Sequence, residues 1–247
     1  MTFKDHFSGV ARGYAAYRPT YPPSLVDFLA DEASRRDAVW DAGCGSGQLS
    51  TLLARRFARV IATDPSSDQI AQARPQAGVE YRQASAEASG LDDASVDVAV
   101  AAQAAHWFDL PRYYAEVRRV VRPGGLVALL AYGVVHLDRE LTSIMDRFYW
   151  QTLAGYWPQE RRIVEEGYRS LPFPFPEIQA PPFVMTATWS LADLLGYVRT
   201  WSAVQEIERA RGSEPYAGFA RALTGAWGDP GRQREVRWDV AVRAGKI

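Results

Sequence analysis

The chain has 247 residues, of which 47% are apolar, and its 28 Lys and Arg residues nearly balance 29 Asp and Glu, for a formal charge of −1. This balance argues against nucleic-acid binding, which needs excess positive charge to offset phosphates. No apolar run reaches the ~18 residues of a membrane span, and the first residues lack the apolar core of a secretory signal. Cys44 is the single cysteine, so no intramolecular disulfide can form. We expect a soluble, cytoplasmic globular protein.

The first half of the chain alternates helical and strand-like patterns. Apolar residues at helical spacing predict helices at 24–33, 48–57, 68–74 and 111–121. Continuous apolar runs predict strands at 38–42, 59–63, 96–102 and 126–132, and the alternation places a further strand at 79–83. Ser24 is expected to cap the first helix, and Gly124-Gly125 to end the fourth. The alternation indicates a doubly wound α/β fold, in which helices cover both faces of a parallel sheet.

The rhythm changes after Gly133. The pattern predicts helices at 138–155, 160–170, 190–210 and 215–227, with Ser190 capping the third, and strands at 183–189 and 234–244. These two strands suggest an antiparallel addition at the sheet edge. We predict one domain over 1–247: an N-terminal lid and helix (1–34), a cofactor-binding core (35–135), a helical insertion covering the carboxyl edge of the sheet (136–182), and C-terminal helices and edge strands (183–247).

The strongest motif is the loop Asp41-Ala42-Gly43-Cys44-Gly45-Ser46-Gly47 between the first strand and the next helix. Three glycines in five residues let the backbone turn tightly and approach a ligand closely. A helix that starts near Gln48 would direct unpaired N–H groups to the same place. Alternatively, the glycines only let the strand and helix pack closely. The motif by itself leaves both interpretations open.

Asp64 ends the second strand, 23 residues after Asp41. A carboxylate at the tip of the neighbouring strand can accept hydrogen bonds from both hydroxyls of a ribose. The alternative is a helix N-cap with Pro65 at the first helical position. Both roles are compatible with each other, and the joint occurrence of glycine loop, spacing and acid favours a nucleoside site.

The loop also restricts which nucleoside fits. Gln48 occupies the position where the dinucleotide motif G-x-G-x-x-G has its last glycine, and no Gly-Lys-Ser/Thr follows as in a phosphate-binding P-loop. Asp41 would repel a pyrophosphate but suits an ammonium group. A cofactor with an amino-acid tail is therefore favoured over one with phosphates.

These residues resemble those of a known family. DAGCGSG, the acid of ATDPS, Ser85-Ala86-Glu87 and VVRPGGLVAL are together similar to the motifs of class I S-adenosylmethionine-dependent methyltransferases. YAAYRPTYP, AAQAAHWFD and LPFPFPEI resemble the methyltransferase type 11 or trans-aconitate methyltransferase-like branch. The resemblance implies a Rossmann-like, doubly wound seven-stranded sheet in the order 3-2-1-4-5-7-6, with strand 7 antiparallel.

The same resemblance implies a set of site residues. Asp41 and the Gly43 backbone would bind the methionine ammonium end of S-adenosyl-L-methionine, and Asp64 the ribose. Ala86 would donate its backbone N–H to adenine, with Glu87 beside it and Ser85 where many relatives have an aspartate. Gln103 would line the methyl side. The complete expected cofactor set is Tyr14, Arg18, Asp41, Gly43, Cys44, Gly45, Gly47, Asp64, Pro65, Ser85, Ala86, Glu87 and Gln103.

Methyl transfer from a sulfonium depends on alignment more than on proton transfer. His106 is the candidate catalytic residue, as a base or a donor that positions the substrate, and a structural role in its loop is the alternative. The run from Tyr14 to Arg18 would form a lid, or else a packed aromatic arm. Candidate substrate contacts are Trp107, Arg199 and Trp201, and the neighbouring aromatics Trp150, Tyr156, Trp157 and Tyr197 would be wall or core. No metal site is predicted.

The prediction is thus a methyltransferase that uses S-adenosylmethionine and acts on a small molecule, with a small carboxylic acid as a candidate that Arg18 or Arg199 would bind. Two alternatives stay open: a non-catalytic protein that binds the cofactor or a small molecule on the same fold, and a nicotinamide-dependent oxidoreductase. We expect a monomer or weak homodimer with neither a nucleic-acid nor a membrane partner.

Overall fold

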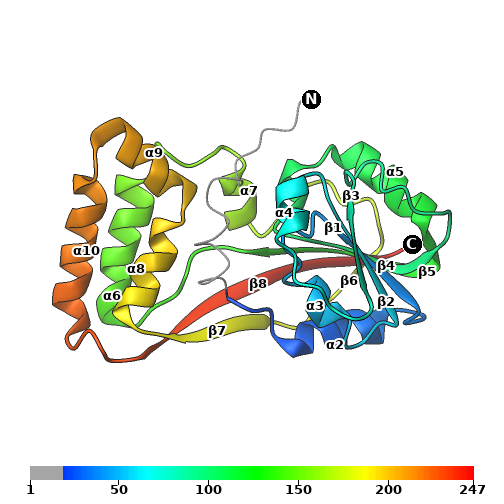
Figure 1. Ribbon diagram of the computed structural model, residues 1–247, viewed down its shortest axis with the longest axis horizontal. Coiled ribbons are helices and arrows are strands. Elements are labelled where there is room, and N and C mark those ends of the chain that lie inside the picture. The colour runs from blue at the N-terminus through cyan, green and yellow to red at the C-terminus, as the bar shows by residue number, and fades with distance from the viewer. Residues whose placement is uncertain (1–18) are drawn as a thin grey trace.

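The computed structural model describes residues 19–247, and a single mixed sheet runs through it (Figure 1). Its strands follow the order β3-β2-β1-β4-β5-β8-β6, and β7 also pairs with β8. The first five strands pair in parallel: β1 (Ala38–Ala42), β2 (Arg59–Asp64), β3 (Val79–Gln83), β4 (Val96–Ala102) and β5 (Val121–Tyr132). The last three pair antiparallel: β6 (Glu177–Ile178), β7 (Phe183–Trp189) and β8 (Arg234–Lys246). The predicted Rossmann-like order and its antiparallel strand are confirmed, with β6 as an added short strand.

Helices cover both faces of the sheet, as predicted. Alternate residues of a strand point to opposite faces, so Val39 of β1 lies in one core and Trp40 in the other. The first core takes apolar side chains from α2 (Pro23–Glu32) and α3 (Ser50–Leu53), and the second takes them from α5 (Leu110–Val120). A short helix, α4 (Ser67–Ala71), follows β2.

The predicted ends of the first helices need correction. The first helix begins at Pro23, with Pro22 as N-cap and no side-chain cap, so Ser24 does not cap it. Pro23 starts the helix one residue early because its fixed φ suits the first helical position. The helix predicted over 48–57 is reduced to α3, which is flanked by hydrogen-bonded turns. The Ser66 side chain caps α4 by accepting a hydrogen bond from the Gln69 backbone.

The Gly124-Gly125 pair does not end a helix, contrary to the prediction. α5 stops at Val120 and β5 begins at the next residue, so both glycines lie inside β5. A Cβ on Gly125 would lie 2.4 Å from the Val121 side chain and 2.6 Å from the Asp97 carbonyl oxygen. Gly124 has φ +77° and donates its N–H to the Ile247 carbonyl. The pair therefore permits close strand packing.

A lobe of helices extends beyond the sheet along the long β7–β8 ribbon (Figure 1). It consists of α6 (Arg139–Asp146), the π-helix η2 (Arg147–Thr152), α8 (Leu191–Arg199), α9 (Ser202–Arg211) and α10 (Glu214–Trp227). Its buried side chains Phe219 and Trp227 belong to the same apolar core as Leu126 of β5. Between lobe and sheet lies α7 (Arg161–Glu165), the shortened form of the helix predicted over 160–170.

Two further predictions about this lobe have different outcomes. Ser190 caps α8 as predicted, in a reciprocal capping box with Asp193. The helix predicted over 190–210 is instead two helices, because the helical conformation is interrupted at Thr200 and Trp201. Within the described residues, no helix is long and apolar enough to cross a membrane.

The amino ends of the central strands are tied together by one buried acid. Asp97 of β4 is inaccessible to solvent and accepts hydrogen bonds from the backbone N–H groups of Asp37 (2.7 Å) and Ala38 (2.9 Å). Its other oxygen accepts from Arg122 Nη1 at 2.5 Å. Asp97 thereby fixes β1 against β4 and β5.

We expect Asp97→Ala to lower the free energy of unfolding by ~3 kcal/mol or more, because it leaves Arg122 and two backbone amides without their acceptor. Urea denaturation measures this loss. The control is Asp93→Ala, since the Asp93 side chain is 80% exposed and only pairs with Arg119; the expected loss there is below ~1 kcal/mol. Equal losses in the two variants would contradict this account of Asp97.

Candidate functional site

The glycine loop lies at the carboxyl end of β1 and is attached to the end of β2. Gly43, Gly45 and Gly47 all have positive φ values, of +70°, +55° and +84°. The backbone N–H groups of Gly43 and Cys44 donate to the Thr63 carbonyl oxygen at 2.8 and 3.0 Å. The loop therefore needs glycine at these positions, because residues with a side chain rarely adopt positive φ. It also depends on β2, whose Thr63 carbonyl accepts its hydrogen bonds.

The loop glycines are also required by packing. A Cβ on Gly43 would lie 2.6 Å from the Ala104 side chain, and one on Gly47 would lie 2.2 Å from the Tyr81 hydroxyl. The glycines therefore allow close packing, but against β3 and the segment after β4 and not between the first strand and the next helix. This packing does not compete with a binding role, because a loop this close to its neighbours also leaves its backbone close to any ligand at the strand ends.

Asp41 is a buried acid beneath this loop. Its Oδ2 accepts a hydrogen bond from Ser50 Oγ at 2.6 Å, whereas its buried Oδ1 has no partner in the described part of the chain. Burial raises the pKa of Asp41 to about 7; the Ser50 hydrogen bond opposes this rise and the nearby Asp64 adds to it. An unpartnered, buried carboxylate oxygen is costly unless a donor or cation reaches it.

Asp64 connects β2 to the loop. Its Oδ2 accepts from the Gly45 backbone and its Oδ1 from the Ser66 backbone, each at 2.9 Å. Burial raises the pKa of Asp64, and these two hydrogen bonds oppose the rise. The N-cap alternative for Asp64 is wrong, since Ser66 caps α4. Pro65 follows as the turn residue, and its carbonyl accepts from Gln83.

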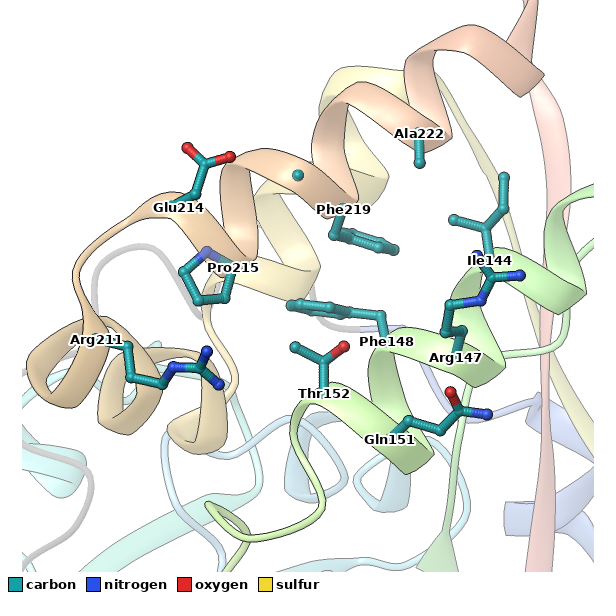
Figure 2. A pocket seen from close by; sticks show the side chains of 11 residues that line it. Ile144, Arg147, Phe148, Gln151, Thr152, Arg211, Glu214, Pro215, Phe219 and Ala222 are labelled. Carbon is teal, nitrogen blue, oxygen red and sulfur yellow. The ribbon is translucent and has the colours of Figure 1, made fainter.

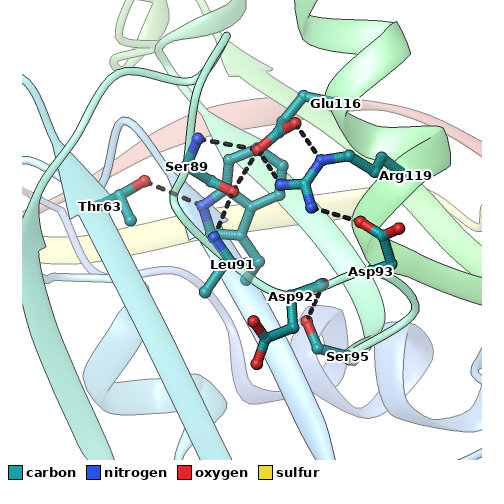
Figure 3. Close-up of polar contacts among 9 residues, drawn as sticks. Thr63, Ser89, Leu91, Asp92, Asp93, Ser95, Glu116 and Arg119 are labelled. Carbon is teal, nitrogen blue, oxygen red and sulfur yellow. Dashed lines mark hydrogen bonds and ion pairs between the residues drawn. The ribbon is translucent and has the colours of Figure 1, made fainter.

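The segment after β3 carries Ser85, Ala86 and Glu87 and is held to α5 (Figure 3). Glu116 of α5 accepts from the Ser89 backbone (2.9 Å) and hydroxyl (2.5 Å), and from Arg119. Burial raises the pKa of Glu116, but the hydrogen bonds from Arg119 and Ser89 outweigh it and lower that pKa to about 2. Glu116 is therefore ionised at neutral pH, and the segment it anchors is fixed.

That segment also contacts the loop after β4. Ser85 and Ala88 form an isolated bridge, and Ala86 is buried between them. Glu87 Oε1 accepts from the Asp109 backbone at 2.9 Å. The sequence-predicted residues from three strand ends thus come together at one edge of the sheet.

The loop after β4 carries Gln103 and then the 3-10 helix η1 (Ala105–Trp107). Gln103 has φ +55°, donates its backbone N–H to the Leu130 carbonyl and its side-chain amide to the Tyr132 carbonyl. Strained backbone of this kind is common at functional sites. Trp107, 38% exposed, packs against His106, with ring centroids 4.8 Å apart.

His106 has a partner that the sequence did not indicate. Its Nδ1 lies 2.8 Å from the hydroxyl oxygen of the buried Tyr168. Burial lowers the pKa of His106 to about 3, with Arg161 adding to the shift. His106 is therefore neutral at physiological pH.

Arg161 of α7 is a second residue that sequence reasoning missed. Its Nε lies 2.6 Å from Tyr149 Oη and 3.5 Å from Glu165 Oε1, and the Tyr149 hydroxyl donates to Glu165. Its guanidinium also lies over the rings of Trp157 and Tyr149, 5.2 and 5.7 Å from their centroids. Burial disfavours its charge, but Tyr149, Tyr197 and Glu165 together outweigh burial and raise the pKa of Arg161. Arg161 therefore stays a cation.

The comparisons with known proteins agree with this geometry. Residues 40–129 match the family model described as "Methyltransferase domain". The chain is 34% identical over 206 residues to a protein of Dictyostelium discoideum assigned as a methyltransferase, which covers 81% of this chain and 78% of that protein. The chain belongs to the class I S-adenosylmethionine-dependent methyltransferases. Membership decides against the nicotinamide-dependent and non-catalytic alternatives, and S-adenosylmethionine is the cofactor.

Two further similarities extend this result. A solved structure from Anaeromyxobacter dehalogenans, assigned as a type II methyltransferase, is 50% identical and superimposes with a TM-score of 0.89, covering 93% of this methyltransferase and 98% of that chain. A protein of Saccharomyces cerevisiae assigned as S-adenosylmethionine-dependent is 30% identical over 128 residues, which are 48% of this chain and 44% of that protein. The first similarity includes the helical lobe, and the second is confined to about half of each chain.

The methyltransferase brings only some of the predicted substrate residues to this edge. Trp201 is buried and contacts Tyr149 and Trp157, with ring centroids 5.4 and 5.6 Å away. Arg199 is 65% exposed, lies over the Tyr216 ring and is 4.0 Å from Glu208 in the lobe.

Among the other predicted residues are two outside the described part of the chain, one exposed tryptophan and the single cysteine. Tyr14 and Arg18 lie outside the described residues. Trp150 is exposed. Burial raises the pKa of Cys44, so its thiolate is disfavoured. Residues 19–247 contain no cluster of metal-ligating side chains.

A separate pocket lies within the helical lobe (Figure 2). It has a volume of about 650 Å³ and is lined by residues of α6, η2, α9 and α10, with the stacked rings of Phe148 and Phe219 between the helices. None of its lining residues comes from the glycine loop or the strand ends. It is therefore distinct from the site at the sheet edge.

The raised pKa of Asp41 makes stability depend on pH. The folded protein keeps a proton on Asp41 up to about pH 7, whereas the unfolded chain releases it near its ordinary value of 3.8. The stability this contributes is present below pH 4 and is lost as the pH rises through 7. We expect Asp41→Asn to remove this loss, so that the wild type loses up to ~1.4 kcal/mol per pH unit relative to the variant between pH 5 and 7. Urea denaturation at each pH measures the difference, and parallel profiles would contradict the assignment.

Proposed function

We propose that this methyltransferase acts on a small molecule that carries a carboxylate and that binds between the carboxyl edge of the sheet and α7. The observation that carries the proposal is Arg161, a cation held among aromatic rings on α7. Tyr168, which follows α7 and donates its backbone N–H to Ile163 of that helix, contacts His106. The formal charge of −1 argues against a nucleic-acid substrate. The resemblance to the trans-aconitate methyltransferase-like branch also favours an acid. We further propose a single catalytic domain that works in the cytoplasm.

Arg161 is arranged as an anion-binding residue. Both of its hydrogen-bonding contacts with Tyr149 and Glu165 use Nε, so its two terminal nitrogens have no protein partner among the described residues. Its side chain is 24% exposed and thus partly accessible, and the two terminal nitrogens form the outer edge of the guanidinium. That edge can bind a carboxylate through two parallel hydrogen bonds. Tyr149 and Glu165 fix its direction by holding Nε.

The cofactor residues are proposed from the same geometry. The unpartnered Oδ1 of Asp41 suits the ammonium group of the methionine moiety, and Asp64 has lone pairs left for the ribose hydroxyls. The Ala86 backbone, with Ser85 and Glu87, would face adenine. The other residues of the proposed cofactor set line the loop, the turn or the methyl side: Tyr14, Arg18, Gly43, Cys44, Gly45, Gly47, Pro65 and Gln103. The buried Oδ1 supports this fit, because it requires a donor or cation that the described chain does not supply.

The chemistry needs alignment and little proton transfer. When bound, S-adenosylmethionine supplies an electrophilic methyl group on a sulfonium. An acceptor oxygen would form the new C–O bond as the C–S bond breaks, and the bonding pair would stay on sulfur. Holding the reacting atoms at contact distance can supply ~7–11 kcal/mol of the barrier. A carboxylate arrives already ionised, so its methylation requires no general base.

Asp64→Ala is expected to weaken the binding of S-adenosylhomocysteine by ~1–3 kcal/mol, through lost ribose bonds and the loss of its bond to Gly45. Isothermal titration calorimetry measures the affinity. Asp68→Ala is the matched control, because Asp68 is an exposed acid on the neighbouring α4. Unchanged affinity in Asp64→Ala would overturn the proposed cofactor placement.

The proposed function is tested by a screen of small carboxylic acids, and of phenols and amines for comparison, with labelled S-adenosylmethionine. We expect an acid to be methylated. Arg161→Gln should raise the KM for that acid about 10- to 100-fold, the worth of a charge-assisted hydrogen bond, and leave S-adenosylhomocysteine affinity unchanged. Arg162→Gln is the control, since Arg162 is 83% exposed and pairs with Glu166. Methylation of phenols or amines alone would contradict the proposal.

A further inference from the structure

The hydrogen bond between His106 and Tyr168 determines which ring nitrogen of the imidazole carries the proton. Nδ1 faces the Tyr168 hydroxyl at 2.8 Å, and Nε2 has no partner in the described part of the chain. A neutral imidazole has one N–H and one bare nitrogen. Either Tyr168 donates to Nδ1 and the proton sits on Nε2, or Tyr168 accepts from Nδ1–H and Nε2 is bare. The first arrangement makes His106 a donor, and the second makes it a base.

The hydrogen bonds of Tyr168 distinguish the two arrangements. Its hydroxyl is buried, and His106 Nδ1 is the only hydrogen-bond partner that reaches it among the described residues. A buried hydroxyl hydrogen without an acceptor is costly, and the Tyr168 hydrogen would have none if Nδ1–H donated to the oxygen. The partner in reach is Nδ1, so Tyr168 donates to it and the ring proton belongs on Nε2.

Tyr168 is held rigidly enough to impose this choice. Gly167 and Tyr168 both have positive φ values, of +62° and +63°, which is unusual for a tyrosine. The Tyr168 backbone N–H donates to the Ile163 carbonyl, and its own carbonyl accepts from Arg243 Nη1 of β8 at 2.9 Å. A Cβ on Gly167 would lie 2.8 Å from the Ala241 side chain, so β8 also packs against this turn. Strained backbone that is fixed from several sides commonly marks a functional position.

We propose that Tyr168 is a positioning residue that keeps His106 in the Nε2–H form, so that His106 donates a hydrogen bond to the acceptor carboxylate beside Arg161 instead of removing a proton. The proposal rests on the proposed function for the identity of the acceptor. It assigns the acceptor two donors, the guanidinium of Arg161 and the Nε2–H of His106. The methyl-accepting oxygen is then one that arrives ionised, and no proton is released in the transfer.

The tautomer can be measured without an activity assay. In protein labelled with ¹⁵N-histidine, long-range proton–nitrogen correlations show which ring nitrogen carries the proton. His106→Gln assigns the signal, since the chain has two other histidines, His6 and His136. We expect Nε2–H at His106 in the wild type and loss of this single form in Tyr168→Phe. Nδ1–H at His106 in the wild type would overturn the proposal, even if Tyr168→Phe fails to fold.

Kinetics with the methylated acid provide a second test. Tyr168→Phe should raise the KM for the acid about 3- to 10-fold, the worth of one neutral hydrogen bond, with a smaller change in kcat. His106→Ala should also act on KM, and His106→Gln should recover most of that loss because its amide retains a donor. A base would instead give an equal loss of kcat, ~100-fold or more, in both His106 variants. That outcome would overturn the proposal while leaving the proposed function intact. A screen in which no acid is methylated would instead overturn the proposed function and leave the tautomer result unaffected.

Discussion

The end of β2 fixes the glycine loop through both backbone and side chain, and the proposed cofactor site depends on this attachment. Thr63 supplies a carbonyl oxygen to the Gly43 and Cys44 amides, and Asp64 supplies a carboxylate oxygen to the Gly45 amide. The acid and the loop are therefore a single unit, and neither can move alone. A site whose groups are already held in place loses less entropy when a ligand binds.

The central parallel strands β1, β2, β4 and β5 were readable from sequence because burial on both faces gives continuous apolar runs. The bounds of β1, β3, β4 and β7 match the prediction. Helix limits were less readable, because tertiary contacts decide them. The helical pattern over 190–210 continues through Thr200 and Trp201, yet the helix is interrupted there. Trp201 instead packs in the aromatic cluster around Arg161. The prediction that Gly124-Gly125 ends a helix was wrong for the same reason, because contacts with β4 and with Ile247 determine the role of the two glycines.

The candidate site likewise contains some residues that could be predicted from sequence and others that could not. Asp41 and Asp64 could be proposed from sequence because their spacing is fixed by strand, loop and helix lengths within one local unit. Arg161 and Tyr168 could not, since their directions depend on where α7 ends and on the positive φ of Tyr168. Sequence alone offers no means to distinguish Arg161 from Arg199. The structure separates them: Arg161 lies among aromatic rings on α7, whereas Arg199 lies exposed in the lobe.

Charge is distributed unequally across the edge of the sheet, and this distribution suits the proposed reaction. Acids lie on the proposed cofactor side, at Asp41 and Asp64, whereas the cation Arg161 and the neutral His106 lie on the proposed acceptor side. When a carboxylate attacks a sulfonium, opposite charges cancel as the transition state forms. Water stabilises the separated charges more than the nearly neutral transition state, so exclusion of water favours the reaction. A charged histidine at this point would add a cation that the acceptor does not need, and its low pKa is therefore consistent with a donor that orients the acceptor.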